Sequence, residues 1–286
     1  MGACDKGRQY PSGIRRQMDH MRASIRYRIS SSLLALLLFA IAISAWAADP
    51  DPRQVLAPTG KLRAALYSGT PTSILDPNQS EPRGVGYELG KALATKLGVP
   101  YEPVVYPKNA DVLEAVKTGN ADVAFTNASP ARQKEMNFGP PFLLIQLGYL
   151  VSSGSPVAAS GDVDQKGRRI GVTANSTSDA TLSRNLKNAE VVRATTVTIG
   201  AEMLASGKID AFATNKATLF EMAEKVPGSR VLPDSWGEER HAIAFPKGRE
   251  AGATFIKDFT EQALASGLVK AAIERAGLRG ALTVGK

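Results

Sequence analysis

The stretch Gly119-Asn-Ala-Asp-Val-Ala-Phe-Thr-Asn-Ala-Ser-Pro-Ala-Arg132 organises the rest of the chain. It consists of a helix-ending glycine, a short apolar strand and a polar loop that ends in an arginine. A second copy, Gly207-Lys-Ile-Asp-Ala-Phe-Ala-Thr-Asn215, carries Gly, Asp, Thr and Asn at the same four offsets. A strand that ends in Thr-Asn, once in each half, predicts two similar lobes that face each other across a cleft lined by these loops.

Apolar residues on either side of this stretch recur with the spacing of alternating strands and helices. We expect strands at 61–66, 101–106, 169–173, 191–192, 209–213 and 241–245. We expect helices at 84–98, 109–118, 176–186, 199–205, 216–225, 250–266 and 268–276. This rhythm predicts an α/β fold with largely parallel sheets, in which a ligand lies outside the carboxyl ends of the strands.

The first 47 residues have the pattern of a secretory signal peptide. From Met21 a basic segment precedes an apolar run at 33–43 and the small residues of Ala45-Trp-Ala47. Because this run is short for a membrane span, we favour cleavage after Ala47 over an uncleaved anchor. Cleavage removes seven of the 35 basic residues and two of the 27 acidic ones, so the net charge falls from +8 to near +3. The charge therefore predicts no nucleic acid partner.

Cysteine and histidine usage limits the chemistry of the chain. Cys4 is the only cysteine, and it lies upstream of the predicted cleavage site. The mature chain then has neither a disulfide nor a thiolate metal site. His241 is its single histidine, which excludes a zinc site built mainly from His and Cys. With no glycine-rich phosphate loop of the P-loop type either, we predict neither a metal nor a cofactor.

Three motifs carry a resemblance to a known family. They are Gly84-Val-Gly-Tyr-Glu-Leu-Gly-Lys-Ala-Leu93, then Gly119-Asn-Ala-Asp-Val123, and then Ser129-Pro-Ala-Arg132 with Asn137-Phe-Gly-Pro-Pro-Phe142. In this order the chain resembles solute-binding protein family 3, the periplasmic, polar-amino-acid type binding proteins of ABC transporters. Each motif is modest alone, but the resemblance runs from about Lys61 to Ala276 behind a signal peptide.

The resemblance implies a type II periplasmic binding protein, with two open, mostly parallel sheets joined by two crossing hinge strands. It implies a first lobe of residues 49–148 plus 243–286 and a second lobe of residues 149–242, after a leader and signal peptide at 1–47. It also implies a monomer in the periplasm, which captures a small solute, performs no catalysis and delivers the solute to a membrane permease.

The resemblance assigns the first group of ligand-binding residues. Arg132 takes the position of the arginine that holds the carboxylate of the solute, and a planar guanidinium can grip a carboxylate with two parallel hydrogen bonds. The alternative is a surface arginine at the start of a helix. Asn127 and Ser129 match positions at which the family usually has threonines that complete the carboxylate and amine contacts. Their alternative role is that of loop or capping residues.

In the second lobe, Asn175-Ser176-Thr177 matches a Gly-Thr-Thr loop of the family. Backbone N–H groups at such a helix start favour an anion, although the same residues also cap a helix when nothing binds. The aromatic loop that often encloses the side chain of the solute is absent, since residues 68–73 read Ser-Gly-Thr-Pro-Thr-Ser. Tyr67 and Phe125 are the candidates to replace it, and a core position is the alternative for Phe125.

The most informative departure is Asn215, which stands where amino-acid binders of the family usually have an aspartate. That carboxylate pairs with the ammonium of the solute. Asparagine keeps the hydrogen bonds but lacks the counter-charge, and a buried unpaired ammonium is costly. We therefore predict an anionic solute that need not carry a free α-ammonium, and an Asn215→Asp variant that shifts preference toward ammonium-bearing solutes.

Two other functions remain open on the same scaffold. Cyclohexadienyl dehydratases resemble this family, and their elimination chemistry needs a carboxylic acid whose pKa is raised by partial burial. The candidates are Glu88 on a helix face, the charged turn Glu238-Glu239-Arg240, and His241 near the hinge. The third function is a sensor that presents its ligand-bound form to a receptor, which the sequence does not distinguish from transport.

Overall fold

A computed structural model describes residues 50–283. These residues belong to one compact unit. The predicted signal peptide and its cleavage after Ala47 lie outside the described residues and stay predictions. Within 50–283, no helix has both the length and the apolar character needed to cross a membrane.

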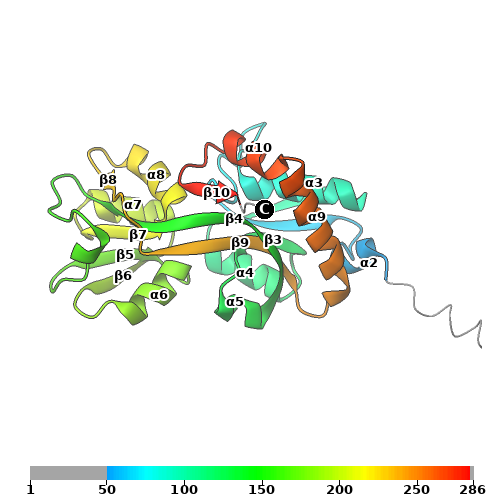
Figure 1. Cartoon of the computed structure of the whole chain (residues 1–286), viewed down its shortest axis with the longest axis horizontal. Coiled ribbons are helices and arrows are strands. Elements are labelled where there is room, and N and C mark those ends of the chain that lie inside the picture. Colours follow the sequence, from blue (N-terminus) through cyan, green and yellow to red (C-terminus); the bar gives the residue numbers. More distant parts are fainter. Residues whose placement is uncertain (1–49, 284–286) are drawn as a thin grey trace, which may run out of the picture. The chain divides into compact units, whose positions relative to one another are not determined.

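Strands and helices alternate along the described chain, and they group into two lobes (Figure 1). The first lobe contains α2 (Pro52–Leu56), β1 (Leu62–Tyr67), α3 (Val85–Leu97), β2 (Tyr101–Tyr106), α4 (Asn109–Lys117), β3 (Val123–Asn127), α5 (Pro130–Glu135), η2 (Glu250–Gly252), α9 (Ala253–Ala265), α10 (Leu268–Arg275) and β10 (Ala281–Thr283). The second lobe contains η1 (Ser160–Asp162), β5 (Arg169–Thr173), α6 (Thr177–Asn185), β6 (Glu190–Ala194), α7 (Val197–Ala205), β7 (Ala211–Asn215), α8 (Lys216–Lys225) and β8 (Arg230–Val231). Two long strands, β4 (Met136–Val151) and β9 (Gly237–Pro246), connect them.

The strands form one hydrogen-bonded sheet in the order β2-β1-β3-β9-β4-β7-β5-β6. In the first lobe β1 pairs in parallel with β2 and β3, and in the second lobe β5 pairs in parallel with β6 and β7. Between these two parallel parts, β9 and β4 run antiparallel to each other and to their outer neighbours β3 and β7. The predicted α/β class with two lobes and two crossing strands is confirmed, and the crossing strands join the two expected sheets into one.

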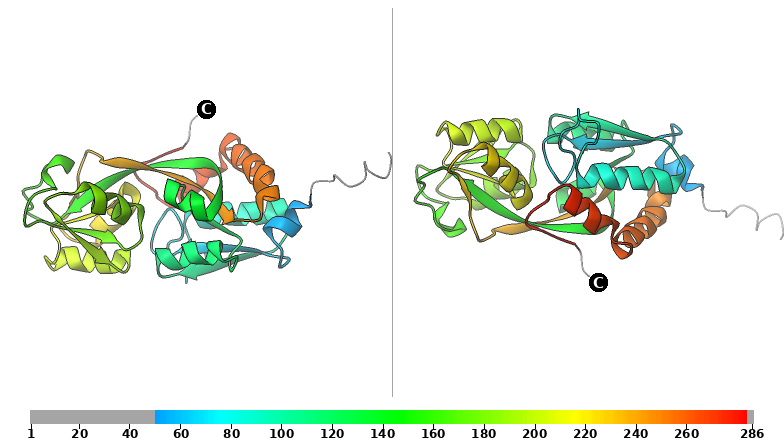
Figure 2. Two further views of the ribbon diagram at one scale, coloured as in Figure 1. Left: turned by 90° about the horizontal axis from the view of Figure 1, so that it is seen from below. Right: turned by 90° about the horizontal axis from the view of Figure 1, so that it is seen from above.

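The two connecting strands pair along most of their length. Their register runs from Met136 opposite Pro246 to Leu147 opposite Gly237, and it shifts around Pro141. Figure 2 shows β4 (green) and β9 (orange) passing together between the lobes in both further views. The expected strands include none at 137–141, whereas β4 is continuous through the motif at 137–142. The lobe boundaries at 148/149 and 242/243 stay predictions.

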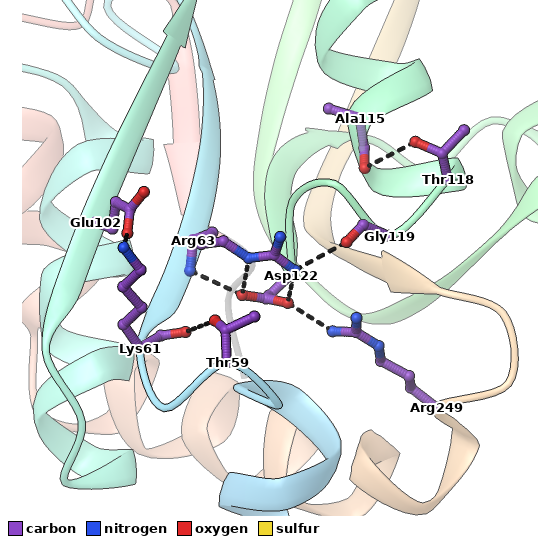
Figure 3. A network of polar contacts seen from close by, with 9 residues as sticks. All are labelled: Thr59, Lys61, Arg63, Glu102, Ala115, Thr118, Gly119, Asp122 and Arg249. Atoms are coloured by element: carbon purple, nitrogen blue, oxygen red, sulfur yellow. Dashed lines mark hydrogen bonds and ion pairs between the residues drawn. The ribbon is translucent and has the colours of Figure 1, made fainter.

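The repeated Gly…Asp motif forms the same structure in both lobes. In the first lobe, the Asp122 carboxylate accepts hydrogen bonds from Arg63 N (2.9 Å), Nε (3.0 Å) and Nη2 (2.7 Å), and Arg63 Nη2 also reaches Gly119 O (2.8 Å). A second guanidinium, from Arg249, approaches Asp122 from the other side at 2.8 Å (Figure 3). Asp122 therefore joins β1, the loop before β3 and the segment after β9.

In the second lobe, Asp210 takes the place of Asp122. It accepts hydrogen bonds from Arg169 N (2.7 Å) and Nη2 (2.9 Å), and Arg169 Nη2 reaches Gly207 O (2.8 Å). Since both aspartates precede the strands that end in Thr-Asn, the motif anchors the first residue of β3 and of β7 against a neighbouring strand. The motif that repeats in the sequence therefore makes the same contacts in both lobes.

Each lobe has its own apolar core. Helices α3, α9 and α10 pack on the sheet of the first lobe around buried side chains such as Leu66 and Phe245. In the second lobe, Phe212 of β7 is fully buried, and it lies directly against the backbone of Gly171 and Gly200. A side chain at either glycine would overlap the Phe212 ring, so the glycines allow α7 and β5 to pack closely on β7.

Candidate functional site

The Thr-Asn ends of β3 and β7 lie beside a common cavity of about 70 Å³. The cavity lies where the carboxyl ends of strands from both lobes meet, as expected for an open α/β sheet. Seven of the nine residues predicted as ligand contacts line it, namely Tyr67, Phe125, Asn127, Arg132, Ser176, Thr177 and Asn215. Because one water needs roughly 10–15 Å³ of such space, the cavity has room for several water-sized groups.

Ser129 and Asn175 do not line this cavity but a second, more open one of about 770 Å³. Ser129 caps α5, and its Oγ accepts a hydrogen bond from Arg132 N at 3.4 Å. Asn175 has a left-handed backbone, with φ of 60°, in the turn before α6. Its backbone N–H donates to Asp179 Oδ2 at 3.0 Å. A ligand contact for these two residues stays a prediction.

Arg132 lies in the first turn of α5, and its guanidinium is held by two neighbouring groups. Its Nη1 donates to Thr126 Oγ1 at 2.8 Å and to Asn127 O at 3.3 Å. Burial lowers the pKa of Arg132, while the charge of Glu239 opposes this shift. A guanidinium starts from so high a pKa that it stays charged at neutral pH. In residues 50–283, no carboxylate forms a direct ion pair with it. The cavity thus contains an oriented cation.

Hydrogen bonds connect the two lobes around the cavity. Asn127 Nδ2 donates to Thr177 Oγ1 at 2.9 Å, and Asn127 Oδ1 accepts from the backbone N–H of Arg240 at 2.9 Å. Tyr67 of β1 accepts a long bond on its hydroxyl from Val197 N, at 3.4 Å. Asn127 therefore links β3 of the first lobe to α6 of the second and to strand β9.

The amino end of α6 faces the cavity through two of the predicted residues. Ser176 is the N-cap, and its Oγ accepts from Asp179 N at 3.1 Å. Thr177 is the first helical residue and contacts Asn127. The capping role, which the sequence left as an alternative, is therefore present for Ser176, and both side chains still line the cavity.

The two predicted aromatic residues differ in their surroundings. Phe125 is 4% exposed and packs edge-on against Phe142, with ring centroids 6.2 Å apart. It is thus chiefly a core residue with one side on the cavity. Tyr67 is half-buried, and burial raises the pKa of its hydroxyl. Tyr67 is therefore neutral at neutral pH and offers a hydroxyl and a ring face.

Glu239 and His241 also line the cavity, and both are buried. The interpretation of 238–240 as a charged turn is wrong, because β9 begins at Gly237. Glu239 pairs with Ile145 and His241 with Leu143 on β4, so burial follows from pairing between distant strands. Their spacing of two places both side chains on one face of a strand. Extending the predicted strand 241–245 by two residues would have included Glu239.

The Glu239 carboxylate is held by a set of hydrogen bonds. His241 Nε2 lies 3.0 Å from Glu239 Oε2, and Asn215 Nδ2 donates to the same oxygen at 3.4 Å. Burial raises the pKa of Glu239, but the His241 hydrogen bond, the charges of His241 and Arg132, and the Thr177 hydroxyl together outweigh it. The pKa of Glu239 therefore lies below its usual value, and the group is an anion at neutral pH.

The other two acid–base candidates lie elsewhere. Glu88 forms an ion pair with Arg275 at 3.1 Å, and Glu238 forms one with Arg240 at 3.5 Å, both with partly exposed side chains. Across the described ranges, no cluster of three or more His, Cys, Asp or Glu side chains could hold a metal ion.

Comparison with known proteins identifies the family of the chain. The family model of the bacterial extracellular solute-binding proteins, family 3, matches residues 63–277. The chain belongs to this family. The match covers both lobes, and it confirms the resemblance on which the predicted site residues rest.

Several proteins are similar to this chain in sequence or in structure. The L-cystine-binding protein TcyJ of Escherichia coli is 24% identical over 217 residues, which is 72% of this chain and 81% of TcyJ. The solved L-cysteine solute receptor of Neisseria gonorrhoeae is 22% identical with a TM-score of 0.71, over 79% of this chain and 93% of that one. An ancestral amino acid-binding protein, AncCDT-1, described as a precursor of cyclohexadienyl dehydratase, has 22% identity and a TM-score of 0.67 over 77% and 96% of the chains. These structures share the two-lobed, type II architecture.

Proposed function

We propose that this solute-binding protein captures a small carboxylate-bearing solute, an amino acid or an organic acid, in the cavity between its lobes. The observation that carries the proposal is Arg132, an oriented guanidinium that lines the cavity without a carboxylate partner among the described residues. A partly buried cation without a hydrogen-bonded anion is costly, and a carboxylate that accepts two parallel hydrogen bonds offsets this cost.

Further support comes from the surroundings of Arg132. The amino end of α6 places Ser176 and Thr177 on the other side of the cavity, where backbone N–H groups add a second attraction for an anion. Relatives are named for cystine, cysteine and other amino acids, all of which carry a carboxylate. Arg132 and α6 come from different lobes, so a bound carboxylate would bridge them.

We further propose that the protein is a periplasmic monomer that delivers its solute to an ABC permease. The family is described as extracellular, and the leader at 1–47 has the pattern of a signal peptide cleaved after Ala47. A receptor in place of a permease would make the same protein a sensor. Co-purification from membranes that contain a permease encoded beside this gene would support transport, and binding only to a receptor would contradict it.

We propose that the protein binds its solute without catalysing a reaction. An acid-catalysed elimination needs a carboxylic acid with a raised pKa, whereas the pKa of Glu239, the acid in the cavity, is lowered. Incubation with prephenate or arogenate is expected to leave both compounds unchanged. Turnover by the wild type that disappears in Glu239→Gln would contradict the proposal.

The test of carboxylate capture is a thermal-shift screen followed by titration calorimetry. The panel contains the common amino acids, cystine, and short mono- and dicarboxylates. A solute at 100 times its Kd adds about 2.7 kcal/mol to the free energy of unfolding, or roughly 5–11 °C in Tm for a protein of this size. We expect such a shift for at least one carboxylate.

Variants of two arginines decide the role of the guanidinium. Arg132→Ala removes two charge-assisted hydrogen bonds of about 1.5–3 kcal/mol each, so affinity should fall by at least about 100-fold. Arg240→Ala is the matched control, because the Arg240 side chain is 67% exposed and only its backbone N–H contacts Asn127. Equal affinities of the two variants would contradict the proposal.

A further inference from the structure

The cavity holds a carboxylate on a different strand from the one on which the family places it. Asn215, at the end of β7, stands where amino-acid binders usually have an aspartate, and Glu239 of β9 lies beside it. The two side chains are buried, and Asn215 Nδ2 is 3.4 Å from Glu239 Oε2. The expected counter-charge is therefore present in the cavity, but it is carried by the neighbouring side chain of Glu239 instead of by residue 215.

We propose that Glu239 forms the subsite for a protonated nitrogen of the solute, held in position by His241 and Asn215. This inference rests on the proposed function, because it adds a second contact to the solute whose carboxylate Arg132 binds. The ligand class then narrows from carboxylates to zwitterions that carry a carboxylate and an ammonium. It reverses the expectation, drawn from Asn215 alone, that the ammonium is dispensable.

The placement of the two charges supports a zwitterion. Arg132 and Glu239 line the same cavity, and each charge affects the other. They nevertheless form no direct ion pair, since the contacts of Arg132 go to Thr126 and Asn127, and those of Glu239 to His241 and Asn215. A solute that carries both charges can satisfy each group with the opposite end, whereas a simple organic acid satisfies only Arg132.

The hydrogen bonds of Asn215 explain why an amide stands at this position. Asn215 Oδ1 accepts from Thr218 N at 3.0 Å and so caps α8, while Nδ2 faces Glu239. An aspartate here would bring a second carboxylate next to Glu239, and two carboxylates at such a distance do not both ionise readily. Asparagine at 215 and glutamate at 239 are therefore compatible, whereas two acids are not.

His241 orients the proposed subsite. Its Nε2, at 3.0 Å from Glu239 Oε2, acts as a donor to the ionised carboxylate. Its other ring nitrogen, Nδ1, is buried and has no hydrogen-bond partner in the described part of the chain. Nδ1 is therefore the ring nitrogen that the described residues leave available to a solute.

The experiment measures the affinity ratio within pairs of solutes that differ only in the ammonium. The pairs are alanine and propionate, cysteine and 3-mercaptopropionate, and arginine and 5-guanidinopentanoate, each titrated by calorimetry. For the wild type, we expect at least one amino acid to bind at least about tenfold more tightly than its deaminated partner, since a hydrogen bond to a charged group contributes about 1.5–3 kcal/mol. In Glu239→Gln the ratio should fall close to one.

A variant that moves the carboxylate from residue 239 to residue 215 separates the effect of the charge on solute preference from any effect on the stability of the fold. Asn215→Asp combined with Glu239→Gln returns the carboxylate to the family's usual strand, and it should restore the preference for the amino acid. Glu238→Gln is the matched control, because this neighbouring glutamate is partly exposed on the same strand and pairs with Arg240. It should leave the ratio unchanged.

The outcomes separate this inference from the proposed function. Carboxylates that bind the wild type equally well with and without the ammonium overturn the subsite and leave carboxylate capture intact. If none of these carboxylates binds, both proposals fail. Should Glu239→Gln not fold, as judged by circular dichroism, the wild-type ratios still decide, because equal binding with and without the ammonium overturns the subsite.

Discussion

The two copies of the Gly…Asp motif offer a matched test of what burial adds to an ion pair. We expect Asp122→Ala to destabilise the protein far more than Asp210→Ala. The Asp122 side chain is 0% exposed and contacts Arg63 and Arg249, which are 18% and 17% exposed. The Asp210 side chain is 33% exposed, and its partner Arg169 is 40% exposed.

The magnitudes follow from these exposures. Removing one partner of a buried pair costs about 3–5 kcal/mol, because the remaining charge stays desolvated. Asp122→Ala leaves two such guanidinium groups, so a loss in this range is expected. At Asp210 water can replace the carboxylate, and a loss of about 1 kcal/mol is expected. In Tm, the two losses correspond to about 6–20 °C and about 2–4 °C for a protein of this size.

Urea unfolding followed by circular dichroism measures both variants, with m-values compared to confirm the same unfolding reaction. The two aspartates share the motif, the arginine contact and the position before a strand, so the comparison isolates burial and the second arginine. Equal losses within about 0.5 kcal/mol would refute the reasoning. Asp122→Asn, which keeps the shape and removes the charge, should fall between the wild type and Asp122→Ala.

Three further perturbations have defined outcomes. Arg132→Lys keeps the positive charge but lacks the two parallel N–H donors of the guanidinium. Losing one charge-assisted hydrogen bond should lower solute affinity roughly 10- to 150-fold, as measured by calorimetry. Unchanged affinity would contradict binding of the carboxylate by two parallel hydrogen bonds. Gly200→Ala places a Cβ 2.7 Å from Phe212 Cζ and should cost about 1–3 kcal/mol in urea unfolding, whereas Gly161→Ala, with open space around it, should not. Because the folded pKa of Glu239 lies below the unfolded value of about 4.3, its contribution to the free energy of unfolding is complete at neutral pH and is lost as the pH falls through the folded pKa. Urea midpoints of the wild type and Glu239→Gln should therefore converge on acidification, and a constant difference would contradict the shift.

Most of the fold was predictable because local signals agree with the tertiary structure. The strand at 101–106 and the helix at 216–225 have the bounds that apolar spacing predicts, and glycines end the helices where expected. The long strand β4 was not predictable in full. Its Gly139-Pro140-Pro141 segment interrupts the apolar spacing, and its pairing with β9 continues there through shifts in register.

The site residues that belong to a sequence motif were predictable. Those that line the cavity because a distant strand buries them were not. Arg132, Asn127 and Thr177 line the cavity because they follow helix starts and strand ends that local sequence specifies. Glu239 lies in a run of charged residues, which is typical of a solvated turn. Its burial depends on β4 lying opposite, nearly a hundred residues away in the chain, and no local pattern records that partner.

Strand β9 has two structural roles, and because of them the rate of solute release should depend on the same residues as the affinity. It connects the lobes, and it also presents Glu239 and His241 to the cavity. Strands β4 and β9 run from one lobe to the other and pair with each other. A change in the angle between the lobes therefore has to bend these two strands. A solute held by Glu239 would stiffen the backbone that must bend for its own escape. Substitutions of Glu239 or His241, the two β9 residues that line the cavity, should thus alter residence time and equilibrium binding together. Substitutions on α5 or α6 can change binding while leaving the flexibility of the connection intact.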